Sequence, residues 1–217
     1  MIVTLIDYTP DPVSVVANAA TLCHFTESAD PAKTVSLLLR KGHLSPFEHA
    51  VFRFGVTGVS RALSHQLVRH RIASFTQESQ RVVQPVPYEA ICPRTVSDAG
   101  TKAVELYMQA VNAAFVAMSE LKKMGVPIED ARYILPNATA TRLLVTMNAR
   151  SLMNFFEQRC CYRAQWEIRE LAESMLDRVS EVAPELFKKA GRSCEKRGIC
   201  REGKPCGKAR VGVYIPG

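Results

Sequence analysis

The residues best suited to chemistry in this 217-residue chain lie between positions 69 and 81. This segment holds three arginines, Arg69, Arg71 and Arg81, together with His70 and several hydroxyl and amide side chains. A guanidinium presents a planar fork of donors that matches a phosphate, and serine hydroxyls and backbone N–H groups can complete such a site. The segment therefore predicts an anion site, most simply for a nucleotide. Composition leaves one alternative open, a solvated basic helix end followed by a polar loop.

Length and composition favour one large globular domain. A chain of 217 residues can bury a full core, and 47% hydrophobic with 23% charged residues is ordinary for a soluble protein. The net charge of +7 suggests a phosphorylated or polyanionic ligand and keeps nucleic acid among the candidates. No apolar run approaches the ~20 residues that span a bilayer, and the first residues do not resemble a signal peptide. We therefore expect a cytoplasmic protein with reduced cysteines and no membrane partner.

The elements that must position the polar segment alternate between strands and helices. Apolar β-branched stretches predict strands at about residues 1–8, 51–56 and 139–147, with a short one at 80–84. Helical spacing and capping residues predict helices at about residues 12–24, 31–42, 60–71, 99–124, 127–135, 148–159 and 164–182, with a last short one from Pro184. We expect an α/β (α+β) fold in which a mixed central β-sheet is flanked by long helices in a single domain.

The segment at residues 42–49 has two interpretations. Ser45 is followed by Pro46 and, three residues on, by Glu48, which is the pattern of a capping box at a helix start. His43 and His49 together with Glu48 also suggest a metal site, but their spacing matches no familiar zinc pattern. We expect the helix start and no metal.

The last part of the chain, residues 191–217, differs in composition from the rest. Cys194, Cys200 and Cys206 are evenly spaced among lysines, arginines and glycines. Three thiols are the beginning of a metal site, but no C-x-x-C pair is present and a fourth ligand would have to come from elsewhere. We favour a glycine-rich loop with free thiols, and we predict a catalytic domain at residues 1–190 followed by this tail at 191–217.

The central segment resembles the signature of one enzyme family, the flavin-dependent thymidylate synthases. Their pattern is R-H-R, two residues, Ser, four residues, Ser, one residue, Arg, and every fixed position is met here. Other stretches resemble the family in the same order along the chain: Gly42-His43 with Pro46 to His49, Ala131-Arg132 with Leu135-Pro136, Asn148 to Leu152, and Ala164 to Ile168.

The resemblance implies a homotetramer that binds FAD where subunits meet and converts dUMP to dTMP. Methylenetetrahydrofolate would give the one-carbon unit, and NADPH would reduce the flavin that supplies hydride. Members of this family are understood to need no cysteine nucleophile, so the resemblance gives none of the seven cysteines that role. It implies no nucleic-acid partner.

The resemblance also assigns site residues. It places Arg159 against the uracil ring, where a guanidinium would stabilise negative charge on the pyrimidine; arginine is no general base because its pKa stays above about 12. For dUMP binding it gives Gln66, Leu67, Val68, Arg69, Gln77, Glu78, Ser79, Gln80, Arg81, Arg132 and Arg159. For FAD binding it gives His43, Ser45, Arg69, His70, Arg71, Gln77, Asn148, Ala149, Arg150 and Asn154.

Two features keep other interpretations open. Some members of the family have an Asn-Glu pair where this chain has Thr76-Gln77, and a neutral amide cannot act as a carboxylate base. The charge and the cysteines also fit a basic nucleic-acid-binding protein whose tail is a metal knuckle. A third interpretation is a flavoprotein reductase that transfers no methyl group.

Overall fold

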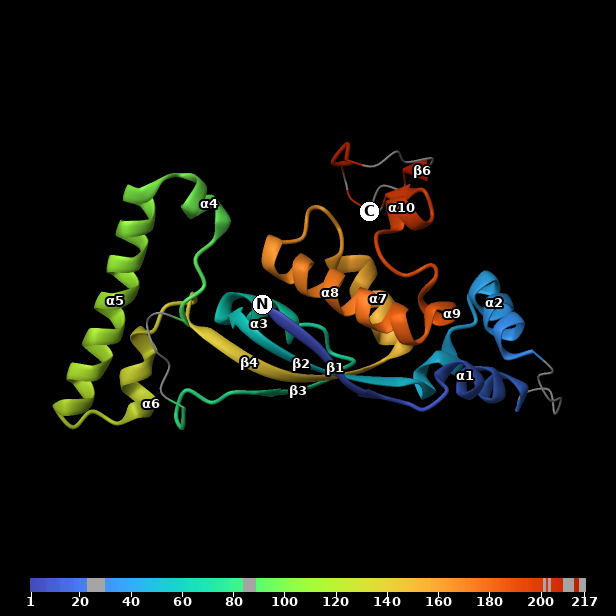
Figure 1. Ribbon diagram of the computed structural model, residues 1–217, viewed down its shortest axis with the longest axis horizontal. Coiled ribbons are helices and arrows are strands. Elements are labelled where there is room, and N and C mark those ends of the chain that lie inside the picture. Colours follow the sequence, from blue (N-terminus) through green and yellow to red (C-terminus); the bar gives the residue numbers. More distant parts are fainter. Residues whose placement is uncertain (23–29, 84–88, 201, 203, 209–212, 215–217) are drawn as a thin grey trace. The chain divides into compact units, whose positions relative to one another are not determined.

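A computed structural model of the chain describes residues 1–22, 30–83, 89–200, 202, 204–208 and 213–214 (Figure 1). Its main sheet has the strand order β1-β2-β4-β3. Hydrogen bonds join β2 and β4 at opposite ends, from Ala149 N to Ala50 O and from Arg61 N to Thr139 O, so these strands are antiparallel. The strands are β1 (Ile2–Tyr8), β2 (Val51–Ser60), β4 (Ala140–Asn148) and β3 (Ser74–Gln77).

The other strand pairs of this sheet follow the same pattern. Thr9 N, just after β1, donates to Val51 O at the start of β2, and Glu78 N, just after β3, donates to Arg142 O near the start of β4. The main sheet is therefore antiparallel, and the mixed strand directions expected from the sequence are wrong. The only parallel pair among the described strands joins two short segments of the tail, β5 (Ile199–Cys200) and β6 (Val213–Tyr214).

Helices account for most of the remaining described chain. Several are confirmed as the sequence predicts, including α2, which ends at Gly42 with φ +74°, and α7, which begins after Asn148. The helices are α1 (Pro12–Thr21), α2 (Pro31–Lys41), η1 (Ser45–His49), α3 (Arg61–Leu67), α4 (Arg94–Asp98), α5 (Thr101–Lys123), α6 (Ile128–Ala131), η3 (Arg132–Ile134), α7 (Ala149–Arg159), α8 (Trp166–Val182), α9 (Pro184–Phe187) and α10 (Ser193–Lys196).

The chain divides into two compact units, and each of the four strands of the main sheet contains residues of both. The first unit comprises residues 1–2, 56–69 and 76–143, and the second comprises residues 3–55, 70–75 and 144–217. In the first, Val111, Phe115 and Met118 of α5 pack with Ala131 of α6. In the second, the core contains a chain of aromatic rings: Phe52, Phe187, Phe156 and Phe155, with neighbouring centroids 5.3 to 6.0 Å apart. No described helix is long and apolar enough to cross a membrane.

The region before and within the polar segment departs from its prediction. β2 runs on through Gly58, which has φ +66°, and ends at Ser60. Helix α3 is shorter than predicted, because it ends at Leu67. Arg69 and Arg71 therefore lie beyond the helix and not in its last turn. The chain turns early because His70 is buried and the following residues form β3 beside β4.

The strand predicted at residues 80–84 is also wrong. Gln80 and Arg81 lie in a turn closed by hydrogen bonds from Val82 N and Val83 N to Ser79 O. Residue 84 lies outside the described chain. The strand forms earlier, at β3, where pairing with β4 satisfies the backbone groups.

Three helix starts or continuations also differ. The capping box at Ser45 is wrong, because η1 has Leu44 as its N-cap without a side-chain cap bond, and the Glu48 carboxylate binds Arg150 instead. The long helix predicted at 99–124 is confirmed as α5, but it starts two residues later, at Thr101, after Gly100 with φ +100°. The helix predicted at 127–135 is α6 followed by the 3-10 turn η3.

Candidate ligand-binding sites

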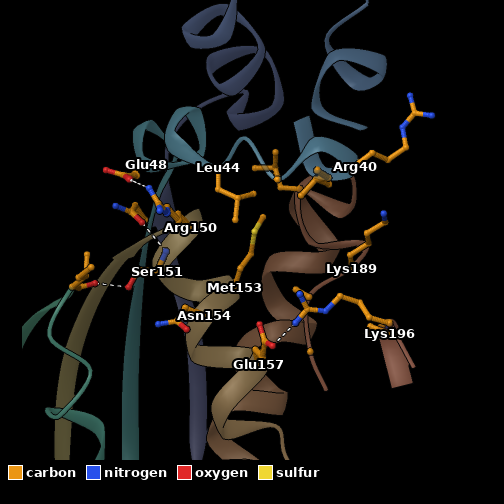
Figure 2. Close-up of a pocket in the computed structure, with 18 residues that line it drawn as sticks. Arg40, Leu44, Glu48, Arg150, Ser151, Met153, Asn154, Glu157, Lys189 and Lys196 are labelled. Atoms are coloured by element: carbon orange, nitrogen blue, oxygen red, sulfur yellow. Dashed lines mark hydrogen bonds and ion pairs between the residues drawn. The ribbon is translucent and has the colours of Figure 1, made fainter. Parts of the chain in front are cut away.

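A cavity of about 860 Å³ lies in the second unit (Figure 2). Its walls come from the end of α2 and the turn after it, from η1, from α7, and from the chain around α9 and α10. Three of the residues predicted to bind flavin line it: Asn148, Arg150 and Asn154. A cavity of this size is typical of sites that hold a cofactor.

The start of α7 fixes these three residues in place. Asn148 is the N-cap, and its Oδ1 accepts a hydrogen bond of 2.8 Å from Ser151 N. Arg150 and Asn154 are four residues apart on the helix, so they lie one above the other on the same face. Arg150 Nη1 also donates to Glu48 Oε1 of η1 at 2.6 Å. The structure therefore confirms that Arg150 and Asn154 share a helix face.

His70 supports the cavity wall from behind. Its Nε2 lies 2.7 Å from Ser151 Oγ, and Ser151 is one of the residues that line the cavity. The Ser151 hydroxyl donates its one hydrogen to the Ile72 carbonyl. Ser151 must therefore accept from His70, so His70 carries a hydrogen on Nε2.

The buried position of His70 keeps its ring neutral. Burial lowers the pKa of His70 below its ordinary value, the hydrogen bond with Ser151 opposes this, and the positive charge of Arg159 lowers the pKa further. The ring also meets the edge of Phe155 with centroids 5.4 Å apart. His70 is thus a fixed, uncharged donor to Ser151 in the first turn of α7, while Ser151 itself binds the chain at residue 72.

The cavity carries unpaired positive charge. Two lining carboxylates, Glu48 and Glu157, form ion pairs with Arg150 and Arg197. Three further lining cations form no ion pair with any carboxylate in the described parts of the chain: Arg40, Lys189 and Lys196. In Figure 2, Arg150 and Asn154 lie on one side of the cavity, and Lys189 and Lys196 on the other. An anionic ligand would satisfy these charges.

A second group of cations lies in the first unit, around Glu129 and η3. Arg81 Nη2 is 2.6 Å from Glu129 Oε2, and Arg132 Nε donates to Glu129 O at 3.1 Å. The positive charge of Arg132 lowers the pKa of Arg61, which places Arg61 in the same neighbourhood. The structure thus brings together two arginines predicted for dUMP, Arg81 and Arg132, through one glutamate.

Arg61 belongs to this cation cluster but was not predicted as a site residue. Its Nη2 donates to Glu78 O at 2.7 Å, while its buried Nε has no partner among the described residues. Burial is the main cause that lowers its pKa, and Glu78 opposes the shift. One signal was available in the sequence, because a cation in the first turn of a helix is disfavoured by the helix dipole. An arginine at that position suggests a role other than helix stability.

Gln77 is anchored on neighbouring hydroxyls. Its Nε2 donates to Ser64 Oγ at 2.9 Å and to Thr141 Oγ1 at 3.2 Å. Both hydroxyl-bearing residues are buried. The amide of Gln77 thus holds β3 to α3 and β4 within the first unit.

The remaining predicted residues are divided between core and surface. Leu67 and Ala149 are fully buried, so their side chains are part of the core. Gln66 donates to Ala62 O at 3.3 Å, and Ser79 Oγ accepts from Arg81 N at 3.2 Å. Surface positions are occupied by Val68, Arg69, Arg71, His43 and Ser45. His43 and Ser45 alternate in sequence with Gly42 and Leu44, which line the cavity.

Arg159 ends α7 with an unused donor. Its Nε is buried and has no hydrogen-bond partner among the described residues. Such a group is costly unless it is satisfied, and a ligand is one way to satisfy it. In the arrangement shown, no three described His, Cys, Asp or Glu side chains lie close enough together to hold a metal ion.

Together these features define an α+β protein with a cofactor-sized, cation-lined cavity and a separate arginine cluster. A family model described as thymidylate synthase complementing protein matches residues 4–185. The chain belongs to this family.

Relatives that cover nearly the whole chain carry the name flavin-dependent thymidylate synthase. One from Geobacter sulfurreducens is 48% identical over 222 residues, covering 96% of this chain and 95% of the relative. One from Clostridium tetani is 43% identical, covering 95% and 93% of the two chains. One from Sulfolobus acidocaldarius is 43% identical, covering 89% of this chain and 78% of the relative.

The buried neutral state of His70 predicts a pH-dependent stability. Because the folded-state pKa is lowered, the unfolded chain binds the extra proton more readily below the ordinary pKa of about 6.5. Stability should therefore be full above that value and decline as pH falls below it. Urea unfolding of wild type and His70→Gln at about pH 8 and about pH 5.5 measures this, because glutamine can still donate to Ser151 but does not titrate.

The matched control for this experiment is His65→Gln, since His65 is exposed on α3. We expect the control to keep the wild-type loss of stability at low pH and His70→Gln to lose less. Equal losses in wild type and His70→Gln would refute the assignment of the pH dependence to His70.

Proposed function

We propose that this protein is a flavin-dependent thymidylate synthase that acts in the cytoplasm. It converts dUMP to dTMP, takes the one-carbon unit from methylenetetrahydrofolate, and uses FAD reduced by NADPH as the source of hydride. The family membership supports the reaction class. The observation that carries the proposal is the cation-lined cavity into which α7 presents Asn148, Arg150 and Asn154.

The residues around the cavity fit FAD. The volume suits a large cofactor, and the unpaired cations Arg40, Lys189 and Lys196 match the charge of a pyrophosphate. Amide and guanidinium groups of α7 offer hydrogen bonds to its polar edges. When bound, the flavin supplies the redox chemistry, and the protein supplies orientation and charge. The proposed contacts are those that the resemblance assigns: His43, Ser45, Arg69, His70, Arg71, Gln77, Asn148, Ala149, Arg150 and Asn154.

The arginine cluster of the first unit fits the phosphate of dUMP. A dianionic phosphate needs several fixed cations, and Arg81 and Arg132 already lie around Glu129. Arg61 adds a buried Nε without a described partner. The proposed contacts are Gln66, Leu67, Val68, Arg69, Gln77, Glu78, Ser79, Gln80, Arg81, Arg132 and Arg159.

Arg159 is the proposed catalytic residue. Its free Nε can donate to a pyrimidine that gains negative charge, which stabilises that charge without any proton transfer. Gln77 is neutral and its amide nitrogen is already used by two hydroxyls, so it does not serve as a base. In this proposal the chain's contribution is therefore electrostatic and positional.

We also propose that the protein forms a homotetramer with active sites shared between subunits. Large apolar side chains lie exposed on β1, an edge strand, and on α5: Ile2 at 67%, Ile6 at 53%, Leu106 at 69% and Val116 at 61%. Apolar surface of this kind commonly marks an interface. Light scattering at micromolar concentration should give about four times the mass of one chain, 24.1 kDa. A monomeric mass would remove this part of the proposal.

The reaction is tested by the visible spectrum of the purified protein. After incubation with FAD and desalting, we expect oxidised-flavin bands that bleach with NADPH under nitrogen. The bands should return when dUMP and methylenetetrahydrofolate are added together, and dTMP should accumulate. Flavin that bleaches but does not return, without dTMP, would leave a reductase in place of the proposed synthase. If no flavin is retained, the next experiment is salt-dependent titration with RNA and DNA.

The role of Arg159 is tested by Arg159→Ala. Losing one preorganised charge at the reacting ring commonly lowers turnover by about 10²–10³. Single-turnover formation of dTMP measures this, with the flavin spectrum and circular dichroism reporting cofactor retention and fold. The control is Arg178→Ala, which removes an exposed arginine paired with Glu181 on α8. Wild-type turnover by Arg159→Ala would exclude the role.

A further inference from the structure

Four cysteines from two parts of the second unit line one small cavity. Cys161 lies in the loop between α7 and α8, whereas Cys194, Cys200 and Cys206 lie in the tail. The cavity holds about 20 Å³, room for a single water-sized occupant. The three tail cysteines alone do not provide the fourth ligand that a zinc site needs. Cys161 lines the same cavity and can be that ligand.

The tail is held against the α7–α8 loop by contacts on either side of these cysteines. Tyr162 OH donates to Glu195 Oε1 at 2.7 Å, and Arg163 Nη2 donates to Lys204 O at 2.6 Å. The guanidinium of Arg192 lies 4.3 Å from the centre of the Tyr162 ring. Three separate contacts thus bring the tail to the residues that directly follow Cys161.

Glu202, between the second and third tail cysteines, also lies near Cys161. Cys161 Sγ lies 3.9 Å from Glu202 Oε1, and Glu202 stands between Cys200 and Cys206 in the sequence. The six cysteines in the described chain are all free thiols, so no disulfide among them uses these sulfurs. Thiols, and not disulfides, are the form that binds soft metals.

We propose that Cys161, Cys194, Cys200 and Cys206 bind one zinc ion that fastens the tail to the loop between α7 and α8. Four thiolates around one ion form the usual structural zinc site, with Zn–S bonds of about 2.3 Å. In the arrangement shown the thiols surround the cavity without converging on one point. Binding therefore requires the four cysteine side chains to turn inward toward one point.

The chemistry of binding at such a site balances. Each thiol exchanges its S–H bond for an S–Zn bond and releases a proton to solvent, without any change of oxidation state. Zinc with four thiolates carries a net charge of −2. Arg163, which binds the tail backbone, and Lys208, whose Nζ lies 5.3 Å from the Tyr162 ring centre, offset part of this charge, whereas Arg192 is already paired with Glu173 and Glu195.

The proposed site joins two parts of the chain. Cys161 lies inside the segment that matches the family model, residues 4–185, and the other three cysteines follow that segment. The zinc would therefore fasten the tail to the family-matched part of the chain. The proposal does not depend on the reaction catalysed, and its test measures metal content.

The test is zinc analysis of the full-length protein, reduced, reconstituted with Zn²⁺ and freed of excess metal. We expect one zinc per chain in wild type, and a rise in Tm when zinc is added to the apoprotein. Cys161→Ser is the decisive variant, because only the structure, and not the spacing of the tail cysteines, identifies Cys161 as a ligand. Each of the four Cys→Ser variants should bind zinc at least about 100-fold more weakly, measured by competition with a chromogenic chelator.

Two control variants separate the site from general thiol effects. Cys92→Ser removes a thiol in the first unit, and Cys160→Ala removes the buried thiol next to Cys161; both should retain one zinc. If the variants fail to fold, Co²⁺ in wild type still decides, because four thiolates give intense sulfur-to-cobalt absorption. Wild type without stoichiometric zinc, a disulfide among the four cysteines of the reconstituted protein, or full zinc retention by Cys161→Ser would each overturn the proposal.

Discussion

The hydrogen bonds at the start of α7 constrain much of the second unit. Ser151 takes part in three of them: its N–H donates to Asn148, its Oγ donates to Ile72, and the same Oγ accepts from His70. Because a hydroxyl has one hydrogen, this arrangement sets the protonation of His70 and the orientation of the helix together. Rotation of α7 would break the two bonds of Ser151 Oγ, which join the helix to His70 and Ile72, so the face that carries Arg150 and Asn154 is fixed toward the cavity.

Charge is arranged differently in the two units. In the second, the carboxylates that line the cavity are paired with Arg150 and Arg197, which leaves other cations available to a ligand. In the first, Arg81 and Arg132 both bind Glu129. Arg81 pairs with its carboxylate, and Arg132 donates to its backbone carbonyl. The positive charge of Arg132 lowers the pKa of Arg61, so these like charges repel each other, and the dianion of the proposed function would relieve that repulsion.

Local sequence patterns predicted what depends on local interactions. Asn148 predicted the start of α7, and helical spacing put Arg150 and Asn154 on one face. The end of α3 and the position of β3 were mispredicted, because burial of His70 and pairing with β4 depend on residues 81 and 64 positions away along the chain, Ser151 and Arg142. The same limit hid Lys189 and Lys196, which join the cavity only through tertiary packing. The arginine motif predicted the kind of ligand, but composition and spacing do not reveal that Arg61 joins Arg132.

The neutral residue at position 77 follows from the hydroxyls around it. Ser64 Oγ already donates its hydrogen to Arg61 O at 3.0 Å, so it can only accept from a third group. Gln77 provides the N–H that this oxygen needs and a second one for Thr141. A carboxylate oxygen at the same place would face the Ser64 oxygen with no hydrogen between them, and unpaired acceptors in contact with each other are unfavourable in a buried environment. In this chain the residue types at positions 64, 77 and 141 thus form one hydrogen-bonding unit that selects an amide over an acid.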